Sequence, residues 1–367
     1  MYFGAANFEE AERAAARGLE LAELLGDGER IASLQYYQGV LIMMRGDADF
    51  ADGLALAEKG VALARESSGG LGLALTRAIA TSYAGDGRFA QARESIDPIL
   101  ADLVRTGHRE RATDTYLGTC WTQNLVLYAE DEYDEVLRNA TETFALAERA
   151  GNFTMRSALA ALLAPVHYLR GDYRETRRWA DVALEIGELI SNKNVFAAGA
   201  ALALASRIHL GEPVDLATYA ERIEIGLRAG GLMQVSTRFV GEALLSAGDL
   251  SLADRLTALL VDRTGGRFRQ ALVLVSRGDV LARLGRLEEA RRCYAEAIAI
   301  AEEIGSRSTL AVAWLGQAEL AAAQGLEPVG LERAAALCAE LGLRHYQPRL
   351  DRLRAAGGDA AAGSSDA

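Results

Sequence analysis

Histidines are the residues in this chain most suited to metal binding or proton transfer. There are four, His108, His167, His209 and His345. None lies three or four positions from another His or Cys, the spacing that places two metal ligands on one helix face. The sequence therefore predicts no metal site.

Nucleotide chemistry would need a glycine-rich loop that ends in Lys-Ser or Lys-Thr. The two lysines, Lys59 and Lys193, are followed by Gly and Asn instead. The stretch Gly69–Gly72 is rich in glycine, but no strand precedes it and it falls between two helical segments, so helix capping explains it better. We expect no nucleotide hydrolysis, no cofactor and no enzymatic activity.

The elements that would hold any site are helices, because small and large apolar residues recur in a helix-pair pattern. The pattern is most complete in one stretch near the C-terminus, where it comprises Leu274, Gly278, Leu281, Gly285, Leu287, Ala290, Tyr294 and Ala297. Weaker copies recur along the chain at intervals of roughly 34 to 44 residues. Small residues in such a pattern fall where two helices touch.

Two kinds of turn separate the expected helices. Within a unit, a Gly or acidic residue precedes an aromatic residue or Leu, as in Gly46–Phe50, Gly87–Phe89, Asp131–Tyr133, Gly171–Tyr173 and Gly248–Leu250. Between units, a helix ends on Gly, and Asp27, Asn152 and Ser306 offer side-chain oxygens to the next helix start. The order predicted is helix, turn, helix, turn.

This pattern resembles the tetratricopeptide repeat family. The units are longer than 34 residues. In their general residue pattern they resemble the C-terminal repeat regions of MalT-like and AfsR-like regulators and of ATPase-linked adenylate or guanylate cyclases of high-GC bacteria. The resemblance implies an all-α, right-handed α–α superhelix of about eight or nine helix pairs. It also implies a concave face that binds a peptide or a partner domain.

Three functions are compatible with this resemblance. The first is a non-catalytic protein–protein interaction scaffold. The second is a regulatory or sensor arm of a larger bacterial signalling protein, such as a cyclase or an ATPase-type transcriptional regulator. The third is a solenoid that senses a small molecule, which would need polar groups converging in the groove. Repeats, acidity and the lack of a catalytic pattern together favour the scaffold.

Composition limits the partners. The chain has 367 residues and a formal net charge of −12, so it should repel nucleic acid. No apolar run approaches the length of a membrane span, and no signal-like core opens the chain, so we expect a cytoplasmic protein. Cys120, Cys293 and Cys338 lie far apart and are expected to be buried and unpaired.

The chain is expected to form one array over residues 1–350, followed by a disordered Ala/Gly/Ser tail over 351–367. Tyr2 stands where a first helix should end, so the first repeat is expected to be truncated, as in a fragment of a longer protein. A single docking helix is the alternative. The oligomeric state is left open.

The first helices of the units should line the concave wall. Counting back from each turn places these residues there: Tyr36, Met43, Met44, Arg77, Trp121, Leu125, Tyr128, Tyr168, His209, Arg238, Glu242, Asp279 and Arg283. Tyr, Trp, Met and Arg are enriched at interface centres, which favours partner binding. The alternative is that Trp121, Tyr128 and Tyr168 fill space between neighbouring units.

Overall fold

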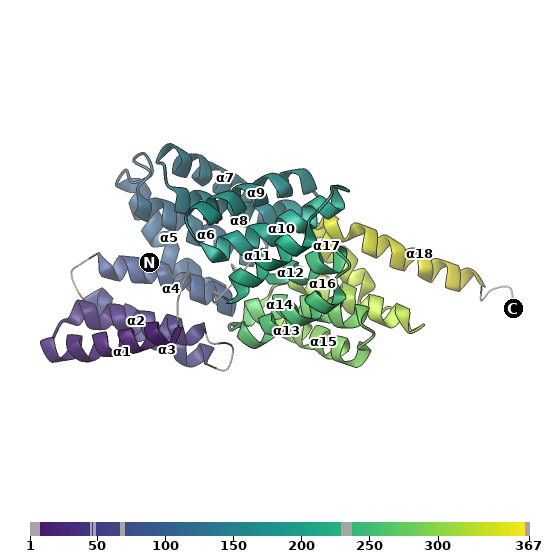
Figure 1. Cartoon of the computed structure of the whole chain (residues 1–367), viewed down its shortest axis with the longest axis horizontal. Coiled ribbons are helices and arrows are strands. Elements are labelled where there is room, and N and C mark those ends of the chain that lie inside the picture. The colour runs from purple at the N-terminus through teal and green to yellow at the C-terminus, as the bar shows by residue number, and fades with distance from the viewer. Residues whose placement is uncertain (1–7, 45, 47–48, 67–69, 229–236, 364–367) are drawn as a thin grey trace.

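A computed structural model describes residues 8–44, 46, 49–66, 70–228 and 237–363. Within those ranges the chain forms α-helices and one short 3-10 helix, and no strand (Figure 1). Within those ranges most consecutive helices pack against one another. The prediction of an all-α helical-repeat superhelix is confirmed.

Eight helix pairs make up most of this array. Their first helices are α2 (Gly28–Met43), α4 (Leu71–Asp86), α6 (Asp114–Ala129), α8 (Phe153–Leu169), α10 (Lys193–His209), α12 (Thr237–Ser246), α14 (Arg267–Arg283) and α16 (Arg307–Ala323). Their second helices are α3 (Phe50–Glu66), α5 (Phe89–Arg105), α7 (Tyr133–Arg149), α9 (Tyr173–Leu189), α11 (Leu216–Arg228), α13 (Leu250–Arg263), α15 (Leu287–Ile304) and α17 (Leu331–Glu340). The remaining elements are α1 (Phe8–Leu25) before the pairs, and η1 (Arg344–Tyr346) and α18 (Gln347–Gly363) after them.

The predicted repeat signature marks a tight helix–helix contact. A Cβ atom on Gly278 of α14 would lie 2.6 Å from the Tyr294 ring of α15, and one on Gly316 of α16 would lie 2.5 Å from the same ring. Tyr294 therefore fills the space between α14 and α16, and glycine at both facing positions is what lets a ring fit there.

The turns within units end the first helices with a residue in the left-handed conformation. Gly87 after α4 has a φ of 83°, and the Arg88 N–H donates to the Tyr83 carbonyl (2.9 Å). Asp131 occupies the corresponding place after α6 with a φ of 66°. That conformation is unfavourable for a residue with a side chain.

The junctions between units follow the predicted capping in two of three cases. Asp27 accepts the Arg30 N–H (3.1 Å) and Asn152 accepts the Met155 N–H (2.9 Å). The prediction for Ser306 is wrong, because its hydroxyl makes no capping hydrogen bond to the backbone of α16. A residue from a distant unit caps that helix instead.

The superhelix turns back on itself, so that early turns lie against late junctions. Asp86 Oδ1 accepts the Arg267 N–H at the start of α14 (3.3 Å), and Asp131 Oδ2 accepts the Ser308 N–H at the start of α16 (3.0 Å). Figure 1 shows α4 beside α14. We call this contact the inter-turn seam, formed by turns 86–89, 131–133 and 170–173 against junctions 265–268, 306–308 and 341–346.

Apolar contacts close the same seam. The Phe89 and Phe268 rings meet edge to face with centroids 5.8 Å apart. Ile304 lies so close to Gly87 that a Cβ there would be 2.6 Å from its side chain. Carboxylate caps and apolar packing therefore hold the second superhelical turn against the first.

The C-terminal helix differs from the tail that the sequence predicts. The backbone is helical to Gly363, and α18 projects from the body of the protein (Figure 1). Leu350 and Leu353 in its first part are buried. Alanine has the highest helix propensity of all residues, which accounts for a helix where we expected disorder.

Two further expectations concern membranes and cysteines. Within the part of the chain that the structure describes, no helix combines the length and apolarity that a membrane span requires. Cys120 and Cys338 are buried, Cys293 is half-buried, and all three are unpaired, as their spacing predicts.

Candidate functional site

The predicted concave residues fall into three groups by exposure. Those buried in the protein are Tyr36, Met43, Leu125, Tyr128, Tyr168 and Arg238. Those half-buried are Met44, Arg77, Trp121, Glu242 and Asp279, and those exposed are His209 and Arg283. The first group contacts the protein's own side chains. Tyr36 and Met43 pack in a local cluster of α2 to α4, whereas Tyr168 meets Phe239 and His345 of later elements across the wall that we expected to be open. Their burial matches the space-filling alternative for Tyr128 and Tyr168.

The N-terminal part of the wall keeps two large side chains, Arg77 and Trp121, partly exposed. Arg77 of α4 crosses to α6, where its Nη1 donates to the Thr115 carbonyl (3.4 Å). A Cβ on Gly118 would lie 2.2 Å from that Nη1, so glycine at 118 makes room for the guanidinium. Burial lowers the pKa of Arg77.

Trp121 lies one turn further along α6. It packs against the main apolar core while part of its ring stays exposed. Leu125 and Tyr128, further along the same helix, are 3% and 2% exposed. Within α6, therefore, Trp121 is the predicted contact residue that a partner could still reach.

A polar network fills the centre of the wall, around Tyr168 of α8. Its ring centroid lies 5.2 Å from that of Phe239 and 4.2 Å from that of His345. Its hydroxyl is 3.2 Å from His209 Nε2 of α10. Although His209 is exposed as a whole residue, partial desolvation of its imidazole and the neighbouring His345 lower its pKa, which favours the neutral ring.

His345 of η1 joins two helices through both of its ring nitrogens. Its Nε2 hydrogen-bonds the Glu242 carboxylate of α12, and its Nδ1 lies 2.9 Å from the Tyr173 hydroxyl of α9. Since the nitrogen facing the carboxylate must donate, Nδ1 accepts from the phenol unless the ring is doubly protonated. The ring therefore fastens the C-terminal segment between α9 and α12.

Glu242 and Arg238 form the charged centre of this network. Arg238 is 3% exposed, and its Nη2 donates to the Tyr346 hydroxyl (2.7 Å). The Tyr346 hydroxyl in turn donates to Glu242 Oε2 (3.4 Å). Burial opposes the ionisation of Glu242, but the charges of His345, Arg238 and Arg349 and the hydrogen bond from His345 outweigh it and lower its pKa to about 2.

A second ionic group continues the network towards the C-terminus. Arg349 of α18 contacts Glu319 of α16 through Nε (2.9 Å) and Asp279 of α14 through Nη2 (3.2 Å). The Tyr294 hydroxyl donates to the same Asp279 oxygen (2.8 Å). Asp279, predicted as a partner contact, is thus engaged by an arginine of the chain itself.

Asp131 and Asp86 are the carboxylates that cap helices across the inter-turn seam. The carboxylate of Asp131 accepts from the Ser308 N–H and, at 3.0 Å, from the Tyr133 hydroxyl. It supplies the cap that Ser306 does not, and an aspartate at a helix start also complements the helix dipole. The cap and the phenol contact offset the strained backbone at residue 131.

Sequence reasoning missed the C-terminal half of the network, His345, Tyr346 and Arg349. These residues lie about 100 positions or more from Glu242 and about 170 from Tyr168 and Tyr173, and no local pattern links them. Asp131 carried a local signal, because it replaces the glycine of the other turns. A search for non-glycine residues at that place would have found it.

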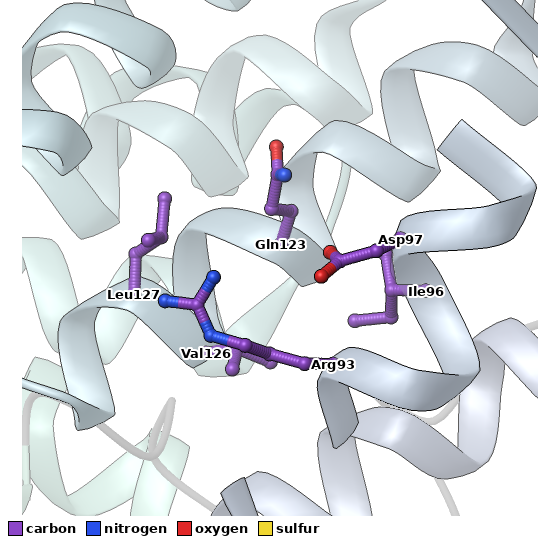
Figure 2. A pocket seen from close by; sticks show the side chains of 6 residues that line it. All are labelled: Arg93, Ile96, Asp97, Gln123, Val126 and Leu127. Atoms are coloured by element: carbon purple, nitrogen blue, oxygen red, sulfur yellow. The ribbon is translucent and has the colours of Figure 1, made fainter. Parts of the chain in front are cut away.

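Two further features of the described residues bear on ligand binding. These residues contain no group of three or more His, Cys, Asp or Glu side chains that could hold a metal ion. A shallow pocket between α5 and α6 is lined by Arg93, Ile96, Asp97, Gln123, Val126 and Leu127 (Figure 2). Arg93 Nε donates there to Glu130 (2.7 Å), so its charge is already paired.

The low pKa of Glu242 leads to a pH-dependence. A carboxyl whose pKa falls from 4.5 to about 2 on folding stabilises the protein fully above pH 4.5. That contribution is lost as the pH falls from about 4.5 towards 2. We expect Glu242→Gln to be less stable than the wild type at pH 6, with a difference that shrinks between pH 4.5 and 2. Urea unfolding at each pH measures it, and a constant difference would contradict the assignment.

Comparison with known proteins adds no family to this description. The sequence matches no protein-family model, and no curated protein matches it either.

Proposed function

We propose that this chain is a non-catalytic protein–protein interaction scaffold of the tetratricopeptide-repeat kind. Two features support the proposal. The described part of the chain forms an array that contains eight helix pairs, an architecture in which successive units build extended binding surfaces. The stretch that most resembles the family signature also makes the expected contact, with Tyr294 seated on Gly278.

The partner surface proposed is the N-terminal part of the concave wall, on α4 and α6. The observation that carries this choice is the exposure of Trp121, since Leu125 and Tyr128 on the same helix are buried. Arg77 lies on the neighbouring first helix and is also half-buried. Tryptophan and arginine are over-represented among residues that dominate binding energy. A peptide or a partner domain is the expected ligand.

Trp121→Ala tests this surface. We expect at least a tenfold loss of partner affinity, about 1.4 kcal/mol or more, with a smaller loss of folding free energy. Affinity capture from lysate of the source organism, followed by mass spectrometry, identifies the partner, and a binding titration with that partner measures the change. Urea unfolding measures stability in parallel.

Trp314→Ala is the matched control, because Trp314 is also half-buried, on the first helix α16. It should lower stability to a similar extent and leave binding unchanged. If Trp121→Ala instead lowers the free energy of unfolding by about 3 to 5 kcal/mol, with binding lost in proportion, Trp121 is a core residue and the proposed surface is wrong.

A further inference from the structure

Exposed apolar side chains gather on two edges of the array. We call the ends where a second helix meets the next first helix the junction edge, and the ends where the two helices of a unit meet the turn edge. The most exposed large apolar residues on the junction edge of α1 to α11 are Leu21, Leu24, Leu25, Leu63, Leu73, Val104, Phe153, Leu189 and Ile225. Those on the turn edge are Leu326 and Val329, between α16 and α17.

Within one molecule, a junction edge and a turn edge cover each other. In the inter-turn seam, the junction edge of α13 to α18 lies against the turn edge of α4 to α9. Gly87 and Gly171 in the covered turns are half-buried, whereas Gly248, Gly285 and Gly325 in the late turns are exposed. Among the described residues, one junction edge and one turn edge therefore remain uncovered, the early junctions and the late turns.

Charged side chains on the two free edges are largely paired within the chain. At the late turn between α14 and α15, Glu288 pairs with Arg291 and Glu289 with Arg286. At the early junction between α5 and α6, Arg105 pairs with Asp102 and Arg109 with Glu142. Exposed ion pairs contribute little to association, so apolar contact is the main term expected in the pairing of these edges.

The helix starts on the free junction edge are capped differently from those in the seam. On the free junction edge, α2, α6, α8 and α10 are capped by the side chains of Asp27, Thr113, Asn152 and Asn192, and α4 has no side-chain cap. In the seam, α14 and α16 have no such cap and depend on Asp86 and Asp131. The free edge is therefore stable without a partner, and apolar contact would drive a reversible association.

We propose that a second copy of this chain covers the free junction edge with its own free turn edge. This arrangement repeats the seam between molecules, so the two copies use different surfaces and associate head to tail. The occupant follows from continuity with the seam, in which the same two edges of this chain already pair. The interface is separate from the partner surface at Trp121.

Edge variants of the full chain test this proposal. Leu24→Glu with Leu189→Glu blocks the junction edge, and Leu326→Glu with Val329→Glu blocks the turn edge. These four side chains are 57% to 81% exposed, so the changes should not disturb the core. Sedimentation velocity of the wild type should show concentration-dependent association, and each variant should raise the dissociation constant at least tenfold. Thr141→Glu, at an exposed site in the middle of α7, should associate like the wild type.

Mixing the two edge variants separates this arrangement from others. Each variant keeps the edge that the other lacks, so the mixture should form a dimer and stop there. A wild type that stays monomeric up to about 1 mM, where binding free energy falls below about 4 kcal/mol, would overturn the proposal. So would a turn-edge variant that still associates, since the junction edge would then pair with itself, or a mixture that stays monomeric. Trp121→Ala should leave the association unchanged, which separates this test from that of the partner surface.

Discussion

Replacing Arg238 by methionine is expected to lower the free energy of unfolding by about 3 to 5 kcal/mol. Arg238 is buried, donates to Tyr346 and faces the ionised Glu242. Methionine keeps much of the apolar stem, so the loss comes from the charge and its hydrogen bonds. The half-buried Glu242 carboxylate would then be left with one fewer positive neighbour. Urea unfolding at pH 7 measures the effect.

The double variant Arg238→Met with Glu242→Gln is the control for this explanation. Removing both charges leaves no uncompensated carboxylate, so it should be more stable than the sum of the two single losses predicts, by about 0.5 to 3 kcal/mol. Strict additivity would show that Arg238 acts through packing alone. Unfolding curves with unchanged slopes are needed for the comparison.

Tyr168→Ala is expected to cost about 3 to 5 kcal/mol of stability, because it removes a fully buried ring and leaves a cavity. The ring lies against Phe239 and His345 and its side chain is 0% exposed. Its loss would open a space between α8, α12 and η1, at the point where the C-terminal segment is held. Thermal and urea unfolding measure the change.

Tyr168→Phe separates the ring from its hydroxyl. It removes only the contact to His209 Nε2, so the expected loss is about 0.5 to 1.5 kcal/mol. If the phenylalanine variant is as unstable as the alanine variant, the hydroxyl and not the packing dominates. If neither variant is destabilised, the network does not hold the seam.

Local structure was largely predictable from the sequence. Helix ends at Gly87 and Gly171 and caps at Asp27 and Asn152 depend on residues within a few positions, so short-range rules suffice. The contact of Gly278 with Tyr294 was predictable for the same reason, since one repeat unit contains both residues.

The candidate site was less predictable. Counting back from each turn placed Tyr128 and Tyr168 on the first helices correctly, but it treated their wall as open. The ring of Tyr168 is covered in part by His345, which follows more than 170 positions later in the chain. Sequence periodicity indicates how neighbouring units stack. It does not indicate how far apart successive superhelical turns lie.

The sequence by itself determined that the chain folds as an array of helix pairs, because the positions of small residues, apolar residues and helix caps act within single units and between neighbours. Only the tertiary structure decided that this array closes on itself. That closure depends on a small rotation per unit, which accumulates until Asp131 meets Ser308 and His345 meets Tyr173. It also decided which edges of the described part of the chain stay exposed.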